Sequence, residues 1–194
     1  MIKKIKNKLE YHFLKLIKPE IISNKKINGL RIGPQSGISN FSHISSKRNN
    51  LSIGKNVFIG HFTYIDANNS KVYIEDHVQI TNYVNILTHS SNNKIRFPNA
   101  KFNKKLEKIG DVKIGAFSFI GPNSVIMPNS VIGKNSVVGA FSFVDGVFPN
   151  YSILRGVPAK IVGDTRTIDE EFIKHNPEFK DYHCKNIRTS STGK

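Results

Sequence analysis

A six-residue repeat between Val112 and Pro149 constrains the fold of this chain more than any other feature. From Ile114 the sequence divides into the hexads IGAFSF, IGPNSV, IMPNSV, IGKNSV, VGAFSF and VDGVFP. An aliphatic residue leads each hexad, Gly usually follows it, and Ser stands fifth in most of them. A period of six is neither the helical period nor the two-residue alternation of an ordinary strand. It is typical of one short flat face of a β-helix, whose coils stack on one another.

The same spacing occurs earlier in the chain. Leading aliphatic residues six apart form three further groups: Ile32, Ile38 and Ile44; Ile53, Ile59 and Ile65; Ile74, Ile80 and Ile86. Every interruption follows a third hexad, so we expect three hexads to form one triangular coil with insertions leaving from one corner. The leading residues then stack into a buried apolar column. Asn at the fourth place suits corners that need a positive φ, and we expect this at Asn56, Asn68, Asn123, Asn129 and Asn135.

The chain divides into three segments around these repeats. Residues 1–24 form a basic segment with apolar residues near helical spacing, which Pro19 ends. Residues 25–163 form the repeat domain, with an inserted basic loop at 90–111. In residues 164–194, Thr167 and Glu170 are spaced as a capping box for a short helix to about Lys174, followed by a tail. We expect the two terminal helices to cover the open ends of the β-helix.

Composition limits the possible partners and compartment. A net charge of +15 favours an anionic partner, such as a phosphorylated cofactor, an acidic polymer or a membrane surface. The single cysteine, Cys184, leaves no disulfide framework and no Cys-based metal site. We see no run of about 18 apolar residues and no secretory signal. These features predict a cytoplasmic protein, either with residues 1–18 lying on the inner face of the membrane or with that helix packed on protein.

The hexads resemble those of the hexapeptide-repeat acyltransferases. Three further phrases carry the resemblance: ILTHSSNN around His89, the restart IGAFSFIGPNSVIMPNSVIG, and PNYSILRGVPAKIVG from Pro149 to Gly163. Together they are similar to the branch with sugar O-acetyltransferases, polysaccharide-modifying acetyltransferases and xenobiotic acetyltransferases. The resemblance implies an all-β fold, a left-handed parallel β-helix, here with an N-terminal amphipathic helix and a short C-terminal helix. It also implies a homotrimer with acetyl-CoA bound between adjacent β-helices.

The resemblance assigns His89 the role of general base. The family's His takes the proton from an acceptor hydroxyl or amine while that group attacks the thioester directly. An imidazole is the usual base near neutral pH, so the residue type agrees with this chemistry. In the coil register, His89 lies one coil above Asn68, about 4.8 Å along the stack. Asn68 or the nearby Asp66 is therefore expected to orient the imidazole or to hold the sugar.

The resemblance also implies residues for the rest of the site. Phe119 occupies a position that is often aromatic and close to the acceptor. Lys160 matches a basic position that meets the nucleotide phosphates of the cofactor. The backbone that lines the pantetheine arm corresponds to Pro122, Gly139, Ala140, Asp145 and Gly146. Where relatives carry Thr-Lys, this chain has Asp145-Gly146, so side-chain contacts can differ there.

These expectations favour an acetyl-CoA-dependent O-acetyltransferase that acts on a sugar, in capsule, lipopolysaccharide or other surface-glycan synthesis. Within the same class, the acceptor can instead be an antibiotic or an amino sugar. The basic loop 90–111 is expected to cover a neighbouring subunit's site and attract anions, or simply to be solvated. A zinc enzyme on the same fold would need three converging His, but His61, His77 and His89 lie in different hexads. We therefore expect no metal. A non-catalytic scaffold or a nucleic-acid binder is the other alternative, but the chain has no interleaved aromatic and basic motif, so we expect no nucleic acid.

Overall fold

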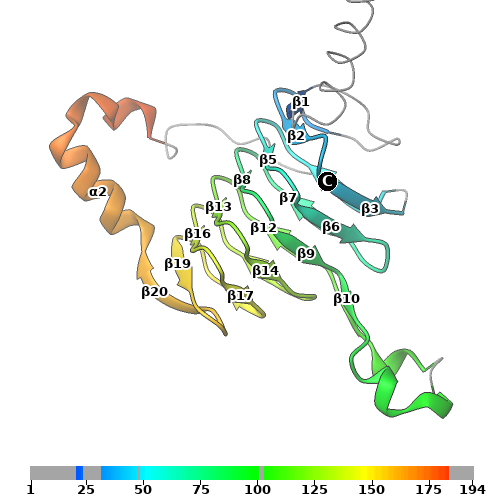
Figure 1. The fold of residues 1–194 in the computed structure, drawn as a ribbon. Helices are drawn as coiled ribbons and strands as arrows, with labels where there is room; N and C mark the ends of the chain where they lie inside the picture. Colours follow the sequence, from blue (N-terminus) through cyan, green and yellow to red (C-terminus); the bar gives the residue numbers. More distant parts are fainter. Residues whose placement is uncertain (1–20, 24–31, 48, 101–102, 184–194) are drawn as a thin grey trace, which may run out of the picture.

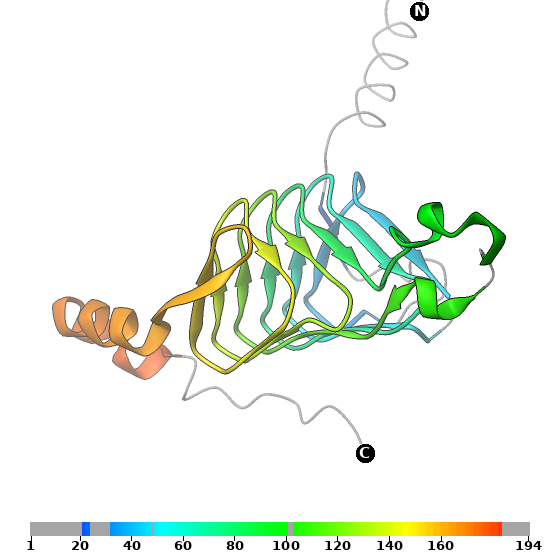
Figure 2. The same ribbon diagram turned by 90° about the horizontal axis from the view of Figure 1, so that it is seen from below.

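The protein is a β-helix of stacked triangular coils (Figures 1 and 2). The computed structural model describes residues 21–23, 32–47, 49–100 and 103–183. The expected helix within residues 1–18 and most of the expected segment 1–24 lie outside these residues. Three parallel sheets form the three faces of the coil, which we call faces I, II and III in the order in which the chain passes through them. The repeats thus form the predicted left-handed parallel β-helix.

Short strands build each face. Face I contains β4 (Leu51–Ile53), β7 (Val72–Ile74), β12 (Val112–Ile114), β15 (Val131–Ile132) and β18 (Val147–Phe148). Face II contains β2 (Gly37–Ser39), β5 (Phe58–Ile59), β8 (Gln79–Ile80), β13 (Phe119–Ile120), β16 (Val137–Val138) and β19 (Ser152–Arg155). Face III contains β3 (His43–Ser46), β6 (Tyr64–Ala67), β9 (Asn85–Leu87), β14 (Val125–Ile126) and β17 (Phe143–Val144). One hexad therefore supplies one face, as the spacing predicts.

The leading aliphatic residues stack in register and fill the core. On face III, for example, Ile65 pairs with Ile86, and Ile86 pairs with Ile126. All three are completely buried. Fifth-place serines lie beside this column and donate hydrogen bonds to backbone carbonyls of the next coil, as Ser118 does to Gly133 at 2.9 Å. Burial of these hydroxyls is tolerated because each has a hydrogen-bond partner.

Where Gly occupies the second place of a hexad, the next coil passes close against it. A Cβ built on Gly133 would lie 2.3 Å from the backbone nitrogen of Asn150. The corners at the fourth place do have positive φ values at Asn56, Asn123, Asn129 and Asn135. Asn68 does not, so that expectation was wrong. Asn69 and Ser70 lengthen the corner there, and a wider turn does not need the left-handed conformation.

Antiparallel strands, rather than helices, flank the described ends of the coil. β1 (Ile21–Ser23) pairs with β2 at one end, and β20 (Lys160–Asp164) pairs with β19 at the other. Helix α2 (Thr165–His175) begins three residues earlier than expected, because Asp164 rather than Thr167 is its N-cap. A short 3-10 helix, η4 (Pro177–Tyr182), follows it. Helix α2 extends away from the coils (Figure 1), so it does not cover the end as expected.

Candidate active site

The candidate site lies where the chain leaves face III and returns to face I. We call this the insertion corner; it comprises residues 67–71, 88–100, 103–111, 127–130 and 145–146. The third coil opens here into a hairpin whose strands are β10 (His89–Ser90) and β11 (Lys108–Ile109), with His89 opposite Ile109. Between them lie three short 3-10 helices: η1 (Lys94–Arg96), η2 (Pro98–Ala100) and η3 (Lys104–Leu106). The hairpin projects from the β-helix (Figure 2), so His89 lies at its root.

A buried carboxylate holds the His89 imidazole. The Nδ1 atom of His89 lies 2.7 Å from Oδ2 of Asp66, which comes from the preceding coil. The Asp66 side chain is 2% exposed, whereas that of His89 is 40% exposed. An ionised carboxylate only accepts hydrogen bonds, so Nδ1 carries the proton and Nε2 keeps its lone pair. The pair thus presents an oriented base to ligands at the surface.

Asn68 holds Asp66 in position through hydrogen bonds. Its backbone N–H donates to Oδ1 of Asp66 at 3.0 Å, so both carboxylate oxygens have partners. Its side chain donates to Oγ of Ser45, 2.5 Å away in the first coil. Of the two residues expected to orient the imidazole, Asp66 makes the contact and Asn68 holds Asp66. Their roles towards an acceptor stay predictions.

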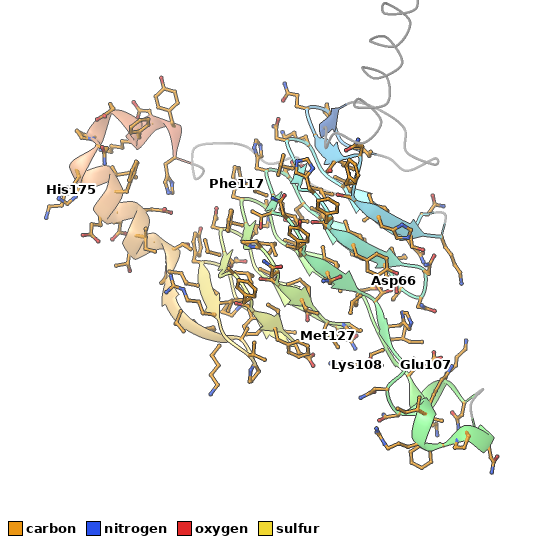
Figure 3. All side chains as sticks on the ribbon, in the orientation of Figure 1. Asp66, Glu107, Lys108, Phe117, Met127 and His175 are labelled. Carbon is orange, nitrogen blue, oxygen red and sulfur yellow. The ribbon has the colours of Figure 1, made fainter. Side chains whose placement is uncertain are left out.

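The return strand of the hairpin is tied to the β-helix by charge. Lys108 forms an ion pair with Asp145, two coils beyond His89, and Lys94 forms one with Glu107. Glu107 and Lys108 lie where the hairpin leaves the β-helix (Figure 3). The hydrogen bond from Lys94 lowers the pKa of Glu107, with smaller contributions from the charges of Lys94, His89 and Lys104. The ion pair with Glu107 neutralises part of the positive charge of the inserted loop.

The end of the inserted loop is fixed by Asp111. Its Oδ1 accepts hydrogen bonds from the Ser70 hydroxyl at 2.5 Å and from the Lys71 N–H at 2.9 Å. The Ser70 bond is the main reason why the pKa of Asp111 lies below its ordinary value. Beside the root, the hydroxyl of the buried Thr88 has no hydrogen-bond partner among the described residues. The corner is thus held by polar contacts on both sides of the hairpin.

The residues expected to bind the cofactor fall into two groups in one subunit. Asp145 and Gly146 lie at the insertion corner with His89. The others lie elsewhere: Pro122, Gly139 and Ala140 at the corner between faces II and III, and Lys160 at the start of β20. Phe119 lies in β13 on face II, which is opposite the insertion corner. A single subunit therefore does not bring Phe119 to His89.

Aromatic residues form a stack that the repeat pattern does not reveal. Phe62 and Tyr83 have positive φ values at fourth places between faces II and III, and their rings stack at 5.1 Å. On the outer side of face III, Tyr64 stacks on His43 at 5.4 Å, beside Asp66. Strict alternation within β6 places Tyr64 and Asp66 on the same side, and this was the available sequence signal for Tyr64.

Within the described ranges, no three or more His, Cys, Asp or Glu side chains gather in a way that would hold a metal ion. None of the helices in those ranges is long and apolar enough to cross a membrane.

Comparison with known proteins gives the following relationships. The family model of the bacterial transferase hexapeptide (six repeats) matches residues 111–146. No curated protein matches significantly. Among solved structures, a mutant of AntD, an N-acyltransferase from Bacillus cereus, in complex with dTDP and coenzyme A is 25% identical with a TM-score of 0.56, over 74% of this chain and 80% of that one. Another AntD mutant, in complex with dTDP-4-amino-4,6-dideoxyglucose and coenzyme A, is 26% identical with a TM-score of 0.56, over the same 74% and 80%.

A more distant structure shares the fold alone. The acetyltransferase domain of PglB from Neisseria gonorrhoeae FA1090, in complex with acetyl coenzyme A, is 16% identical with a TM-score of 0.51. The match covers 68% of this chain and 50% of that one.

Proposed function

Because this chain has the repeats and the fold of the hexapeptide-repeat acyltransferases, we propose that it transfers an acetyl group from acetyl-CoA directly to a hydroxyl of a sugar acceptor. The observation that carries the proposal is the pair formed by the half-exposed His89 and the buried Asp66, which contacts Nδ1 and leaves Nε2 to act as the base. The coenzyme A ligands of the AntD structures support an acyl-CoA donor. The sugar nucleotide bound to AntD supports a sugar acceptor.

The residues suggest the following sequence of steps. The Nε2 atom of His89 removes the proton from the acceptor hydroxyl as its oxygen attacks the thioester carbonyl. The negative charge of Asp66, 2.7 Å from Nδ1, stabilises the imidazolium that forms. The tetrahedral intermediate collapses with cleavage of the carbon–sulfur bond, and the leaving thiolate takes the proton from Nε2. The products are the acetyl ester and free CoA, and His89 is neutral again.

Acylation of an amino sugar is the second candidate. The observation that favours it is the likeness to AntD, which is described as an N-acyltransferase. The same base accepts a proton from an amine as it attacks, so the geometry serves both reactions. The product distinguishes them, since hydroxylamine cleaves an acetyl ester but leaves an amide intact.

We infer that the site is completed in a homotrimer. The predicted cofactor residues at two different corners suit a groove between two subunits, with Phe119, Pro122, Gly139 and Ala140 supplied by the partner. Exposed apolar side chains on β20 and α2 also suit contact with another copy: Ile161, Val162, Ile168 and Phe172. The mass of the protein by light scattering tests this, and a monomer at assay concentration would contradict it.

We further propose the division into residues 1–24, 25–163 and 164–194, with a role in surface-glycan synthesis at the cytoplasmic side of the membrane. The basic residues within 1–18 support contact with anionic lipid. Binding to vesicles with and without anionic lipid tests this contact, using full-length protein and a variant without residues 1–18.

The activity is tested by release of free thiol from acetyl-CoA in the presence of sugars, amino sugars and nucleotide sugars. We expect release that depends on one of these acceptors, and an acetylated product by mass spectrometry. Release that is independent of acceptor, or absent with the entire panel, would contradict the proposal.

A further inference from the structure

An aromatic surface lies next to the candidate base on the outer side of face III. Tyr64 in β6 pairs with His43 in β3, and their rings are stacked with centroids 5.4 Å apart and planes inclined by 23°. His43 is exposed and Tyr64 is half-buried. On the other side of Tyr64, β9 places Asn85 in register with it. We call His43, Tyr64 and Asn85 the face III platform.

The platform is close to the base. Tyr64 and Asp66 are two residues apart on one strand, so they share its outer side at a separation of roughly 6.6 Å. Asp66 in turn contacts His89. Burial raises the pKa of Tyr64, and the negative charge of the nearby Asp66 raises it further. A ligand on the platform therefore lies beside the carboxylate that holds the proposed base.

This spacing decides which part of an acceptor fits. One sugar ring resting on Tyr64 lies on the side of the strand that carries Asp66, and its substituents extend along face III towards His89. The base of a nucleotide-linked sugar is separated from that sugar by a ribose and a diphosphate. It would have to bind farther from His89 when the sugar reacts.

The chemistry of the platform also suits a sugar ring. The face of an aromatic ring carries negative charge density, and the C–H bonds of a pyranose carry partial positive charge. Asn85, the Tyr64 hydroxyl and Ser45 offer polar groups around the rings, and Ser45 is in register with Asp66 on β3.

We propose that the face III platform binds the pyranose ring of the acceptor and positions its reacting substituent at His89. This inference rests on the proposed function and deepens it by naming the residues that recognise the sugar. Tyr64 is thus a specificity-determining residue that contacts the ring, and not one that exchanges protons with it.

The test compares two Tyr64 variants with a matched tyrosine on another face. Full-length wild-type protein is assayed for thiol release from acetyl-CoA with glucosamine, methyl glucoside and UDP-glucose, and the best of these is used as the probe. We expect Tyr64→Leu to raise the KM for this sugar about tenfold and to leave the KM for acetyl-CoA unchanged. Tyr64→Phe keeps the ring, so its sugar KM stays within about twofold of wild type. The control Tyr73→Leu changes an outward tyrosine of β7 on face I and is expected to alter neither KM.

Different outcomes overturn different parts of the proposal. An unchanged sugar KM in Tyr64→Leu, or an equal rise in both KM values, would refute the platform while leaving the proposed function intact. Wild-type protein that releases no sugar-dependent thiol with any of the three probes would overturn the proposed function and the platform with it. Thermal unfolding of each variant establishes that a change in KM does not come from loss of the fold.

Discussion

Replacing Asp66 by Asn is predicted to reverse the proton arrangement of His89. The Asn68 N–H donates to Oδ1 of Asp66, so the amide oxygen of an Asn at this position must occupy that place. The amide NH2 then faces Nδ1 of His89, 2.7 Å away in the present structure. Nδ1 must accept this hydrogen bond, which moves the imidazole proton to Nε2. An imidazole protonated at Nε2 cannot remove a proton from an acceptor.

The magnitude follows from the cost of the alternative arrangement. Turning the amide would leave the Asn68 N–H without its acceptor and would oppose two donors at Nδ1, at a cost of about 1–3 kcal/mol. That lowers the fraction of the productive tautomer roughly 5- to 150-fold. The lost charge also no longer stabilises the imidazolium. We therefore expect kcat to fall by about 10³-fold, within the range typical of general bases.

The informative comparison is with Asp66→Ala, which removes the carboxylate without offering a donor to Nδ1. Water can then accept from Nδ1–H, so Asp66→Ala should be about ten times more active than Asp66→Asn. The assay is thiol release at saturating acetyl-CoA and sugar, and 15N NMR of the imidazole reports the tautomer. Equal activity of the two variants, or higher activity of Asp66→Asn, would refute the tautomer argument.

Three further predictions concern stability. Thr88→Val removes a buried hydroxyl that has no partner among the described residues, so the free energy of unfolding should rise by about 1 kcal/mol in denaturant titration; a decrease would indicate an unrecognised partner. Gly133→Ala should lower that free energy by about 1–3 kcal/mol, because its Cβ meets the backbone of Asn150. Gly139→Ala should cost less, since the nearest atom belongs to the flexible side chain of Arg155, at 2.9 Å; equal losses would contradict this reasoning. The pKa of Asp111 is lowered in the folded state, so its contribution is present above the unfolded pKa and disappears as the pH falls through the folded one. Asp111→Asn should therefore lower the free energy of unfolding by about 0.5 kcal/mol at neutral pH, with solvent screening allowed for, and the difference from wild type should shrink below about pH 4; a difference that is constant with pH would contradict it.

The fold was predictable because the period of the hexads defines both the strands and their register. Once three hexads form a coil, Ile65 and Ile86 must lie in one column, and an insertion after Ile86 must leave from the corner after face III. The N-cap of α2 was less predictable, because both Asp164 and Thr167 are good capping residues and the end of β20 decides between them. The positive φ values of Phe62 and Tyr83 were missed because Asn is the usual residue there, whereas contacts between rings in successive coils occur only in the folded chain.

The candidate site was partly predictable for the same reason. The register places His89 one coil above the segment that contains Asp66, so their proximity follows from the period. Lys108 and Asp145 meet only because the hairpin returns along the β-helix, and a periodic pattern contains no information on the path of an insertion. Tyr64 is one of several outward aromatic residues, and only its stack on His43 beside Asp66 distinguishes it.

The most direct test of the central claim is acceptor-dependent thiol release by wild-type protein and by His89→Ala, with acetyl-CoA binding measured in both. We predict that His89→Ala lowers kcat with the best sugar acceptor by about 10²–10⁴-fold while its affinity for acetyl-CoA stays that of wild type. Near-full activity in His89→Ala would contradict the assignment of His89 as the base.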